Sequence, residues 1–285
     1  MKVNKIAPEE NPYLQILANI AIPPRILHFI GSLPKERTPS VAIVGTRKPT
    51  SYGKEVTLRL ASDLARRGVT IVSGLALGVD GLAHQATLDA GGRTIAVLGN
   101  GLPEIYPSRH RSLAEQIIRD GGAIMSEYGD HTPGLPFQFL ERNRLVSGLS
   151  DAIVITEAAL RSGTMSTAAH ALEQGKDIFV VPGNITSPMS AGCNALLRRG
   201  AIPVTDARDI LEVIAPSTLE PQVSLPLGST PDETTLIKLL QMGVRDGDEL
   251  LQKSKLKAPE YTQALTMLEL AGIIRGLGAN QWTLR

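Results

Sequence analysis

Residues 41–47 read VAIVGTR, an apolar run that ends in a glycine, a small hydroxyl residue and an arginine. Three further apolar segments, at 69–73, 93–98 and 151–156, also lead through glycine or serine into a helical stretch. Continuous apolar runs of this length are typical of buried parallel strands. Because such strands end at one edge of a sheet, their free backbone N–H groups gather there and suit phosphate groups. The sequence therefore predicts that the chain binds a phosphorylated molecule.

Strands and helices are predicted to alternate from residue 41 to residue 214, which indicates an open α/β sheet that is mostly parallel. The predicted strands are 41–45, 69–73, 93–98, 123–126, 151–156, 177–181 and 202–204. The predicted helices lie near 53–67, 80–91, 108–120, 137–149, 164–175, 192–199 and 206–214. Residues 1–40 are predicted to be a helical lead-in, because their apolar residues recur at near-helical spacing.

The last quarter of the chain has a different organisation. Residues 215–230 are rich in Pro, Ser and Thr without periodicity, which is typical of a linker. Residues 231–285 are predicted to form three helices followed by a β-hairpin, the arrangement of a winged helix domain. The predicted fold is therefore an α/β domain at 41–214 with a small winged-helix domain after it.

Composition excludes several classes of protein. With 285 residues, 42% of them hydrophobic and 20% charged, the chain is globular and holds one or two domains. Cys193 is the only cysteine, which excludes an internal disulfide and a Cys-rich zinc cluster, and we expect no metal or cofactor. The N-terminus lacks a signal-peptide apolar block and no segment could span a membrane, so a cytoplasmic protein is expected.

The net charge of +1 does not by itself suggest nucleic acid, but the type of base is informative. Residues 41–214 contain 14 arginines and only 3 lysines. Arginine grips phosphate with a rigid planar fork and stacks on bases. A genome that favours arginine is the alternative explanation.

The first candidate site is the loop after residue 44. A phosphate-binding loop needs glycines for backbone freedom and hydroxyl groups for hydrogen bonds, and this loop contains both. The candidate residues are Gly45, Thr46, Arg47, Ser51 and Gly53. The loop matches neither GxGxxG nor the Walker sequence, which disfavours dinucleotide and P-loop chemistry. We expect Arg47 to point into the cleft; the alternative is a surface arginine.

The second candidate is Ser73 and Gly74, followed by Asp80 and His84 on one helix face. The segment has no GxSxG elbow, and an Asp–His pair lacks the third ligand that a catalytic zinc needs. Hydrolysis is therefore disfavoured. A hydrogen bond between Asp80 and His84 that holds the loop is expected instead.

The remaining candidates are arginines and a helix start. Arg109 follows the third strand and could equally be part of a solvated helix face. Arg142, Asn143 and Arg144 lie between apolar neighbours and could grip a phosphate backbone. The alternative is internal salt bridges to Glu141 or Glu157. The helix after the fifth strand is predicted to begin at Arg161, Ser162, Gly163 and Thr164. The backbone N–H groups of a helix start predict an anion site there. Residues 182–184 and 190–194 are expected to complete the same rim.

Together these segments resemble the DNA-processing protein A family, also called DprA or Smf. The resemblance covers about residues 12–214. It rests on nine motifs in order: IVGTR, SYG, SGLALGVDGLAH, TIAVLGNGL, IYP, SEY, FLERNRLVSGLS, EAALRSGTMSTAAHALEQGK and VPGN followed by SAGCNALL. The family's Gly-Ser/Ala-Arg element falls on residues 45–47, where Thr46 replaces the usual Ser or Ala. Its RNR element falls on residues 142–144.

The resemblance implies an extended Rossmann-like domain that binds single-stranded DNA. It also implies delivery of that DNA to the RecA recombinase during natural transformation, and a homodimer formed through the Rossmann-like domain. The winged unit varies across the family. Its expected recognition helix, about 259–271, holds two Glu and no Lys or Arg, so protein contacts or weak DNA contacts are predicted for it.

The resulting hypothesis is a non-enzymatic grip on single-stranded DNA with four main phosphate donors, Arg47, Arg109, Arg142 and Arg144. A variant with Arg47 and Arg142 changed to Ala is expected to stay folded and lose binding. Aromatic residues are 4% of the chain, so stacking must be limited. The nearby candidates for stacking are Tyr52, Tyr106, Phe137 and Phe139.

Two alternatives stay open at this point. The segment around Gly163 also resembles the PGGxGT loop of nucleotide phosphoribohydrolases, but Thr167 stands where those enzymes carry a catalytic glutamate. The winged unit alone could indicate a transcription regulator, although its equal numbers of acidic and basic residues weaken that interpretation.

Overall fold

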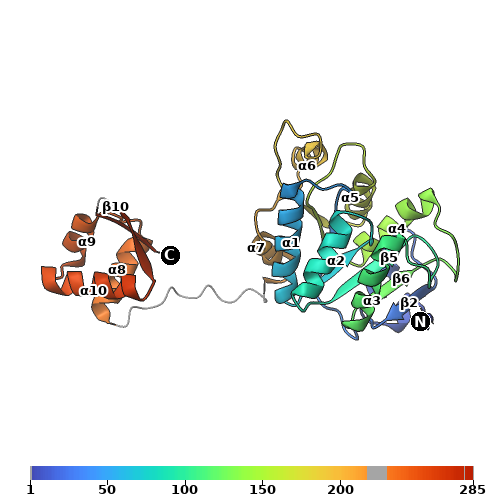
Figure 1. Cartoon of the computed structure of the whole chain (residues 1–285), viewed down its shortest axis with the longest axis horizontal. Helices are drawn as coiled ribbons and strands as arrows, with labels where there is room; N and C mark the ends of the chain where they lie inside the picture. Colours follow the sequence, from blue (N-terminus) through green and yellow to red (C-terminus); the bar gives the residue numbers. More distant parts are fainter. Residues whose placement is uncertain (1, 217–229, 279, 285) are drawn as a thin grey trace. The chain divides into compact units, whose positions relative to one another are not determined.

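The computed structural model describes most of the chain, namely residues 2–216, 230–278 and 280–284 (Figure 1). The chain divides into two compact units, Met1–Leu219 and Glu220–Arg285, and each is described by itself. The predicted linker at 215–230 lies almost wholly outside the described residues. Within the described part of the chain, no helix has both the length and the apolar character needed to cross a membrane.

The first unit is built on one nine-stranded sheet with the order β1-β2-β6-β5-β4-β3-β7-β8-β9. The strands are β1 Asn4–Ile6, β2 Leu27–Gly31, β3 Ser40–Val44, β4 Thr70–Ser73, β5 Thr94–Leu98, β6 Ala123–Ser126, β7 Ala152–Ile155, β8 Asp177–Val180 and β9 Ile202–Pro203. The strands β3 to β9 are parallel, and β1 and β2 are antiparallel at one edge. The predicted open, mostly parallel sheet is confirmed.

Helices cover both faces of this sheet (Figure 1). They are α1 Ser51–Arg66, α2 Val79–Asp89, α3 Arg111–Arg119, α4 Pro136–Gly148, α5 Gly163–Glu173, α6 Ala191–Leu197 and α7 Ala207–Ile214. The helices α1, α2, α3 and α7 pack on one face, and α4, α5 and α6 on the other. Because both faces are covered, strands such as β3 are buried at every position and read as unbroken apolar runs.

The order of the strands creates a crevice at the centre of the sheet. From β3 the chain moves outward through β4, β5 and β6, and then returns to place β7 on the other side of β3. The connections after β3 and β7 therefore leave the same sheet edge in opposite directions. Ligands of open α/β sheets bind at such a switch point.

The predicted helical lead-in at 1–40 is wrong. This segment contributes the strands β1 and β2, with short 3-10 turns at Pro8–Glu10 and Gln15–Asn19 between them. The strand β2 pairs with β6 along residues 28–31. Short apolar runs such as that in β2 are compatible with the period of a helix and with that of a strand. This run forms a strand because it pairs with the open edge of β6.

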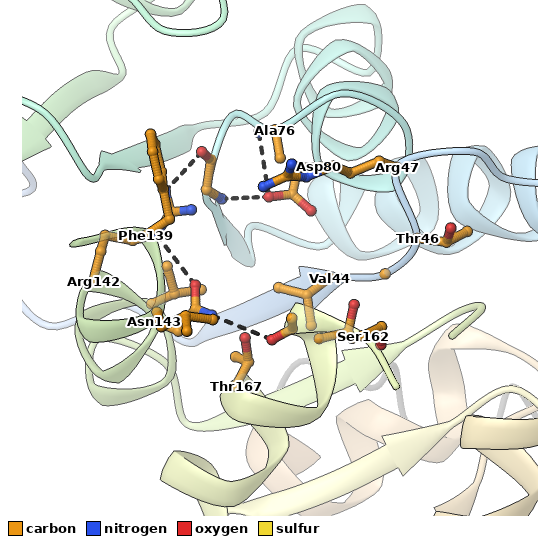
Figure 2. A pocket seen from close by; sticks show the side chains of 16 residues that line it. Val44, Thr46, Arg47, Ala76, Asp80, Phe139, Arg142, Asn143, Ser162 and Thr167 are labelled. Carbon is orange, nitrogen blue, oxygen red and sulfur yellow. Dashed lines mark hydrogen bonds between the residues drawn. The ribbon is translucent and has the colours of Figure 1, made fainter. Parts of the chain in front are cut away.

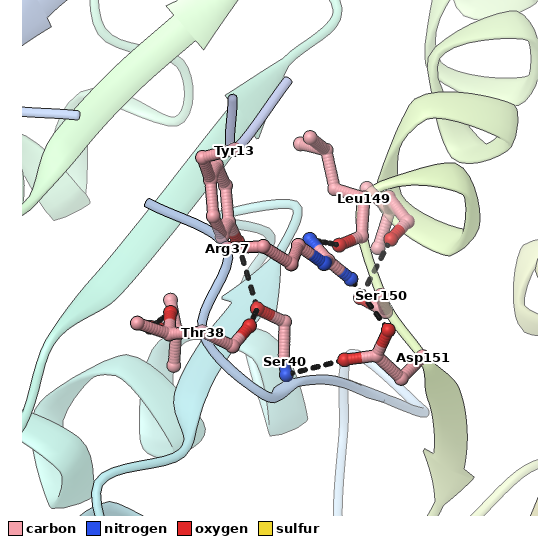
Figure 3. Close-up of polar contacts among 9 residues, drawn as sticks. Tyr13, Arg37, Thr38, Ser40, Leu149, Ser150 and Asp151 are labelled. Atoms are coloured by element: carbon pink, nitrogen blue, oxygen red, sulfur yellow. Dashed lines mark hydrogen bonds and ion pairs between the residues drawn. The ribbon is translucent and has the colours of Figure 1, made fainter. Parts of the chain in front are cut away.

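A polar network fastens this N-terminal segment to the opposite end of the sheet from the crevice (Figure 3). Arg37 donates to the Leu149 carbonyl at 2.9 Å and pairs with Asp151 at 2.6 Å. The Arg37 guanidinium also lies 5.1 Å from the centre of the Tyr13 ring. The Tyr13 hydroxyl bonds to Ser40 at 3.1 Å, and burial raises the pKa of Tyr13 to about 12. The network therefore holds the start of β3 to the start of β7.

The second unit contains three helices and a hairpin: α8 Pro231–Gln241, α9 Gly247–Ser254, α10 Ala258–Leu270, β10 Ile274–Gly278 and β11 Gln281–Leu284. Its core includes Leu236, Leu240, Leu250 and Leu268. The predicted recognition helix corresponds to α10. The predicted hairpin turn includes Ala279, which lies outside the described residues.

Candidate functional site

A pocket of about 360 Å³ opens at the switch point (Figure 2). Its walls come from the loops after β3 and β4, from α2 and α4 and from the start of α5. The lining residues are Val44, Gly45, Thr46, Arg47, Gly74, Ala76, Asp80, Phe139, Leu140, Arg142, Asn143, Val146, Ser162, Gly163, Thr164 and Thr167. Nine of the fifteen predicted site residues therefore line one pocket; the other six are Ser51, Gly53, Ser73, Arg109, Arg144 and Arg161.

Arg47 is the exposed cation of this pocket. Its guanidinium has no hydrogen-bond or ion-pair partner among the residues that the structure describes. Arg47 also lines a basic hollow beside the pocket, together with Lys48, Lys54, Arg109 and His110. No Asp or Glu is among the residues that line this hollow. Arg109 thus lines the same hollow as Arg47, and its role as a phosphate donor stays a prediction.

The helix N-terminus that the sequence assigned to phosphate, at α1, is occupied by the protein itself. The Glu157 carboxylate accepts hydrogen bonds from the backbone N–H and the hydroxyl of Thr50, both at 2.8 Å. A Cβ at Gly53 would lie 2.3 Å from a carboxylate oxygen of Glu157, so this glycine makes room for the carboxylate. The predicted cradle at Ser51 and Gly53 is therefore corrected: an internal anion already fills it.

The turn after β4 is also satisfied internally. Ser73 is buried and donates its hydroxyl to the Ile43 carbonyl at 2.7 Å. The carboxylate of Asp80 accepts from the N–H groups of Gly74 and Ala76, at 3.0 and 3.4 Å. The Gly74 amide, which the sequence assigned to phosphate, therefore binds Asp80 instead. Between them Leu75 has a positive φ of 56°, a strained conformation that these contacts hold.

The predicted hydrogen bond between Asp80 and His84 is wrong. The His84 ring contacts the Thr94 hydroxyl at 2.7 Å, and Thr94 donates that hydroxyl to the Ile71 carbonyl. Since the Thr94 hydrogen is used, the Nδ1 of His84 must donate, which leaves Nε2 unprotonated and buried. Burial lowers the pKa of His84 to about 3, and the neighbouring His110 and Arg142 lower it further.

Arg142 lines the pocket but is committed to the protein. It is buried, with 5% of its surface exposed, and it donates to the carbonyls of Gly74 and Val97. Burial lowers the pKa of Arg142 to about 10, and the Asp80 charge opposes that shift. Arg142 and Asp80 thus hold the turn after β4 from its carbonyl and amide sides. The prediction of Arg142 as a main phosphate donor is therefore corrected to a positioning role.

Arg144 forms an internal ion pair, as the alternative interpretation expected, but its partner is not one of the two glutamates named there. One of its nitrogens lies 2.7 Å from both carboxylate oxygens of Glu127, rather than on Glu141 or Glu157. Glu141 instead accepts a hydrogen bond from Tyr128 at 2.9 Å. The Arg144 side chain is only 11% exposed. It does not line the pocket, and its prediction as a phosphate donor is not supported.

The N-terminus of α5 differs from that of α1 because none of the carboxylates that the structure describes binds there. Ser162 stands at the N-cap position, but its buried hydroxyl has no partner among the described residues. Asn143 donates its amide to the Gly163 carbonyl at 3.3 Å. Thr164 and Thr167 line the pocket and are 7% and 2% exposed. Arg161 is exposed and lies outside the pocket lining.

Aromatic side chains flank Arg47 on one side. Tyr106 and Phe139 lie 5.2 Å apart between ring centres, and both line a narrow hollow with Arg47. Tyr52 lies elsewhere: its hydroxyl donates to the Pro182 carbonyl at 2.9 Å. Residues 182–184 and Ser190 line a neighbouring hollow with Tyr52 and do not line the pocket of Arg47, so their part in one rim stays a prediction.

Comparison with known proteins identifies the family. The family described as DNA recombination-mediator protein A matches residues 4–215, and the DprA winged helix domain matches residues 220–280. The protein Smf of Escherichia coli (strain K12) is 39% identical over 280 residues, covering 92% of this chain and 72% of that protein. The chain belongs to the DNA recombination-mediator protein A family. The resemblance stated from nine motifs is confirmed.

Solved structures of DNA recombination-mediator A proteins agree with the fold. The X-ray structure of DprA from Streptococcus pneumoniae matches with a TM-score of 0.69 and 35% identity, over 75% of each chain. A structure of DprA from Helicobacter pylori matches with a TM-score of 0.67 and 34% identity, over 76% of this chain and 97% of that one. That structure concerns the single-stranded DNA binding mode of the Helicobacter pylori protein.

Sequence reasoning missed several residues of this family member's pocket. Lys48 and Lys54 extend the basic hollow. The sequence could have indicated both, because Lys48 follows Arg47 in the loop and Lys54 lies in the helix that comes next. Thr167 was noticed only as the residue in place of a glutamate. Its position one helical turn after Thr164 could have placed it on the same face. Among the described residues, no cluster of three His, Cys, Asp or Glu could hold a metal ion.

Proposed function

We propose that this chain binds single-stranded DNA without cutting it. The observation that carries the proposal is Arg47, an exposed guanidinium with no partner in the described part of the chain. It lies where the pocket, the basic hollow and the aromatic hollow meet. The positive charge of Arg47 also lowers the pKa of the buried Arg142. A phosphate at this point would relieve the repulsion between the two cations.

A strand in this position would find charge and stacking surfaces together. The basic hollow supplies Lys48, Lys54 and Arg109, and the aromatic hollow supplies Tyr106 and Phe139. Aromatic faces stack on any base that a duplex does not hide, so the combination favours single strands of any sequence. Since phosphate contacts dominate, the logarithm of the affinity should fall steeply and linearly with the logarithm of the salt concentration.

The proposal includes the wider role that the family suggests. DNA-processing relatives include the DprA proteins of Bacillus subtilis and Streptococcus pneumoniae. We extend the proposal to a cytoplasmic homodimer that passes its DNA to RecA during natural transformation. Pull-down of RecA and sedimentation of the intact protein test these two points separately.

The test of DNA binding uses Arg47→Ala, measured by fluorescence anisotropy with a labelled oligothymidylate. Loss of one charge-assisted contact should lower the affinity by at least ~10-fold. The control is Arg93→Ala, because Arg93 is exposed and precedes β5 at the opposite end of the sheet. Equal affinity of the Arg47 variant and the unchanged protein, with both folded, would refute the proposal.

The same proteins can be tested for the enzymatic alternative. Among the described residues, Asp80 is the only carboxylate that lines the pocket, and two backbone N–H groups already hold it. We therefore expect no release of adenine from AMP. Measurable release would favour a phosphoribohydrolase.

A further inference from the structure

The ring of His110 is held in one orientation at the end of the 3-10 turn Ser108–His110. Its Nδ1 lies 2.8 Å from the carbonyl oxygen of Leu75, in the turn after β4. The ring also packs directly on α2, because a Cβ at Gly81 would lie 2.5 Å from the ring carbon Cε1. The hydrogen bond and the glycine together fix the direction in which the ring faces.

The bond to Leu75 decides which ring nitrogen carries a hydrogen. A carbonyl oxygen can only accept, so the Nδ1 of His110 is the donor. The neutral ring then has a bare Nε2, which has no hydrogen-bond partner among the described residues and is open to solvent. Because His110 lines the basic hollow, this nitrogen is available to a ligand there.

The charged groups that line the hollow with His110 are all positive. The loop after β3, α1 and the 3-10 turn supply them: Arg47, Lys48, Lys54 and Arg109. From α3, the exposed Arg111 and Glu115 lie outside the lining. The hollow measures about 630 Å³, and no carboxylate of the described residues lines it. An anion that enters is attracted by every charge around it.

The charged groups beneath His110 are occupied by other partners. On α2, the Asp80 carboxylate accepts from two backbone amides of the turn after β4 (Figure 2), and His84 contacts Thr94. On α4, Arg142 donates to two carbonyls. None of these groups bonds to the His110 ring, so the protein supplies no acceptor for a hydrogen on Nε2.

We propose that His110 binds a phosphate of the DNA strand in the basic hollow and takes up a proton when it does so. A phosphodiester oxygen has no hydrogen to give, so it can contact Nε2 only after the ring is protonated there. The proton comes from solvent, and no covalent bond of the phosphate changes. This phosphate belongs to a nucleotide outside the pocket, because the hollow lies beside it with Arg47 as a shared residue.

This inference rests on the proposed function, because it names a residue that contacts the bound strand. The first experiment measures binding of a labelled oligothymidylate between pH 8 and pH 5.5 at constant ionic strength, a range in which histidine changes its charge. We expect the affinity to increase by roughly 5- to 10-fold as the pH falls, the effect of one charge-assisted hydrogen bond. His110→Asn should abolish this increase, because its amide can donate to the Leu75 carbonyl but cannot take up a proton.

The matched control is His131→Asn, because His131 is exposed and pairs with Glu104 at 2.7 Å, outside the hollow. This variant should keep the full dependence on pH. If the unchanged protein and His110→Asn depend equally on pH, the inference is overturned while strand binding stands. A loss of the same factor at every pH gives that outcome, because it shows a structural role of the ring only.

A second measurement separates this inference from the proposed function. The chain has five histidines, and the signal absent from the NMR spectrum of His110→Asn identifies the ring. Its titration with pH is followed in concentrated dimethyl phosphate, a phosphodiester, and in sodium chloride of equal ionic strength. A midpoint at higher pH in the phosphodiester supports the site even if the protein fails to hold a strand. Equal midpoints overturn the inference even if Arg47→Ala abolishes strand binding.

Discussion

The helices α1 and α5 begin at neighbouring points of one sheet edge, yet among the described residues a carboxylate of the protein itself binds only at the N-terminus of α1. Both follow a buried strand, and both begin in a loop of glycine and hydroxyl residues. At α1 the Glu157 carboxylate takes the Thr50 amide and hydroxyl. At α5 the Ser162 hydroxyl has no partner among the described residues. Loop composition therefore predicts an anion site, but it does not show whether the anion belongs to the protein or to a ligand.

The arginines of the first unit divide in the same way. Arg142 and Arg144 are buried and bind carbonyls or Glu127, whereas Arg47 is exposed and unpaired among the described residues. A buried guanidinium without its partners is costly, so the protein has to satisfy the first two itself. Only an arginine that the fold does not need can serve a ligand.

The largest expected effect on stability comes from removing Arg142, an arginine that binds carbonyls of the protein itself. Arg142→Ala deletes two hydrogen bonds to buried carbonyls and removes the positive charge that lowers the pKa of the buried Asp80. We expect the free energy of unfolding to fall by about 3–5 kcal/mol, because two buried carbonyls lose a charged donor and a buried carboxylate loses an opposite charge. Urea unfolding followed by circular dichroism measures it.

This result would replace the expectation that a double Arg47 and Arg142 variant stays folded. Arg47→Ala is the control, and its unfolding free energy should change by less than ~0.5 kcal/mol. Equal stability of both variants would break the division between internal and free arginines.

Sequence reasoning succeeded where one local pattern sets the structure. The apolar runs of β3 and β7 and the glycines after them predicted the sheet and the edge at which the pocket opens, because burial on both faces leaves few other options. It failed where two distant segments compete for one group. Glu157 follows Thr50 by 107 positions, and Arg144 follows Glu127 by 17. At such separations the sequence does not show which carboxylate will reach a given partner.

A second prediction concerns α2, whose residue His84 is wholly internal. Its pKa of about 3 in the folded protein lies below the ordinary 6.5, so the unfolded chain binds more protons between these values. This contribution to stability is therefore complete above pH 6.5 and is lost as the pH falls towards 3. Between pH 6.5 and pH 5 the loss should be about 2 kcal/mol.

The difference between the unchanged protein and His84→Leu isolates this slope. Comparison is needed because burial raises the pKa of Asp80 from its ordinary 3.8, which contributes a slope of the opposite sign as the pH rises above that value. His131→Ala serves as the control, since His131 is exposed on the surface beside Glu104. Identical pH profiles for the unchanged protein and the His84 variant would contradict the prediction.

The smallest expected effect tests the two helix ends directly. Glu157→Gln keeps an acceptor for Thr50 but removes the charge, so the unfolding free energy should fall by only about 1–2 kcal/mol. The loss of charge leaves the N-terminus of α1 without its anion, and phosphate should then stabilise the variant more than the unchanged protein. Glu115→Gln, at an exposed position of α3, controls for the change in net charge. If phosphate stabilises all three proteins equally, Glu157 is not what distinguishes α1 from α5, and the comparison between the two ends fails.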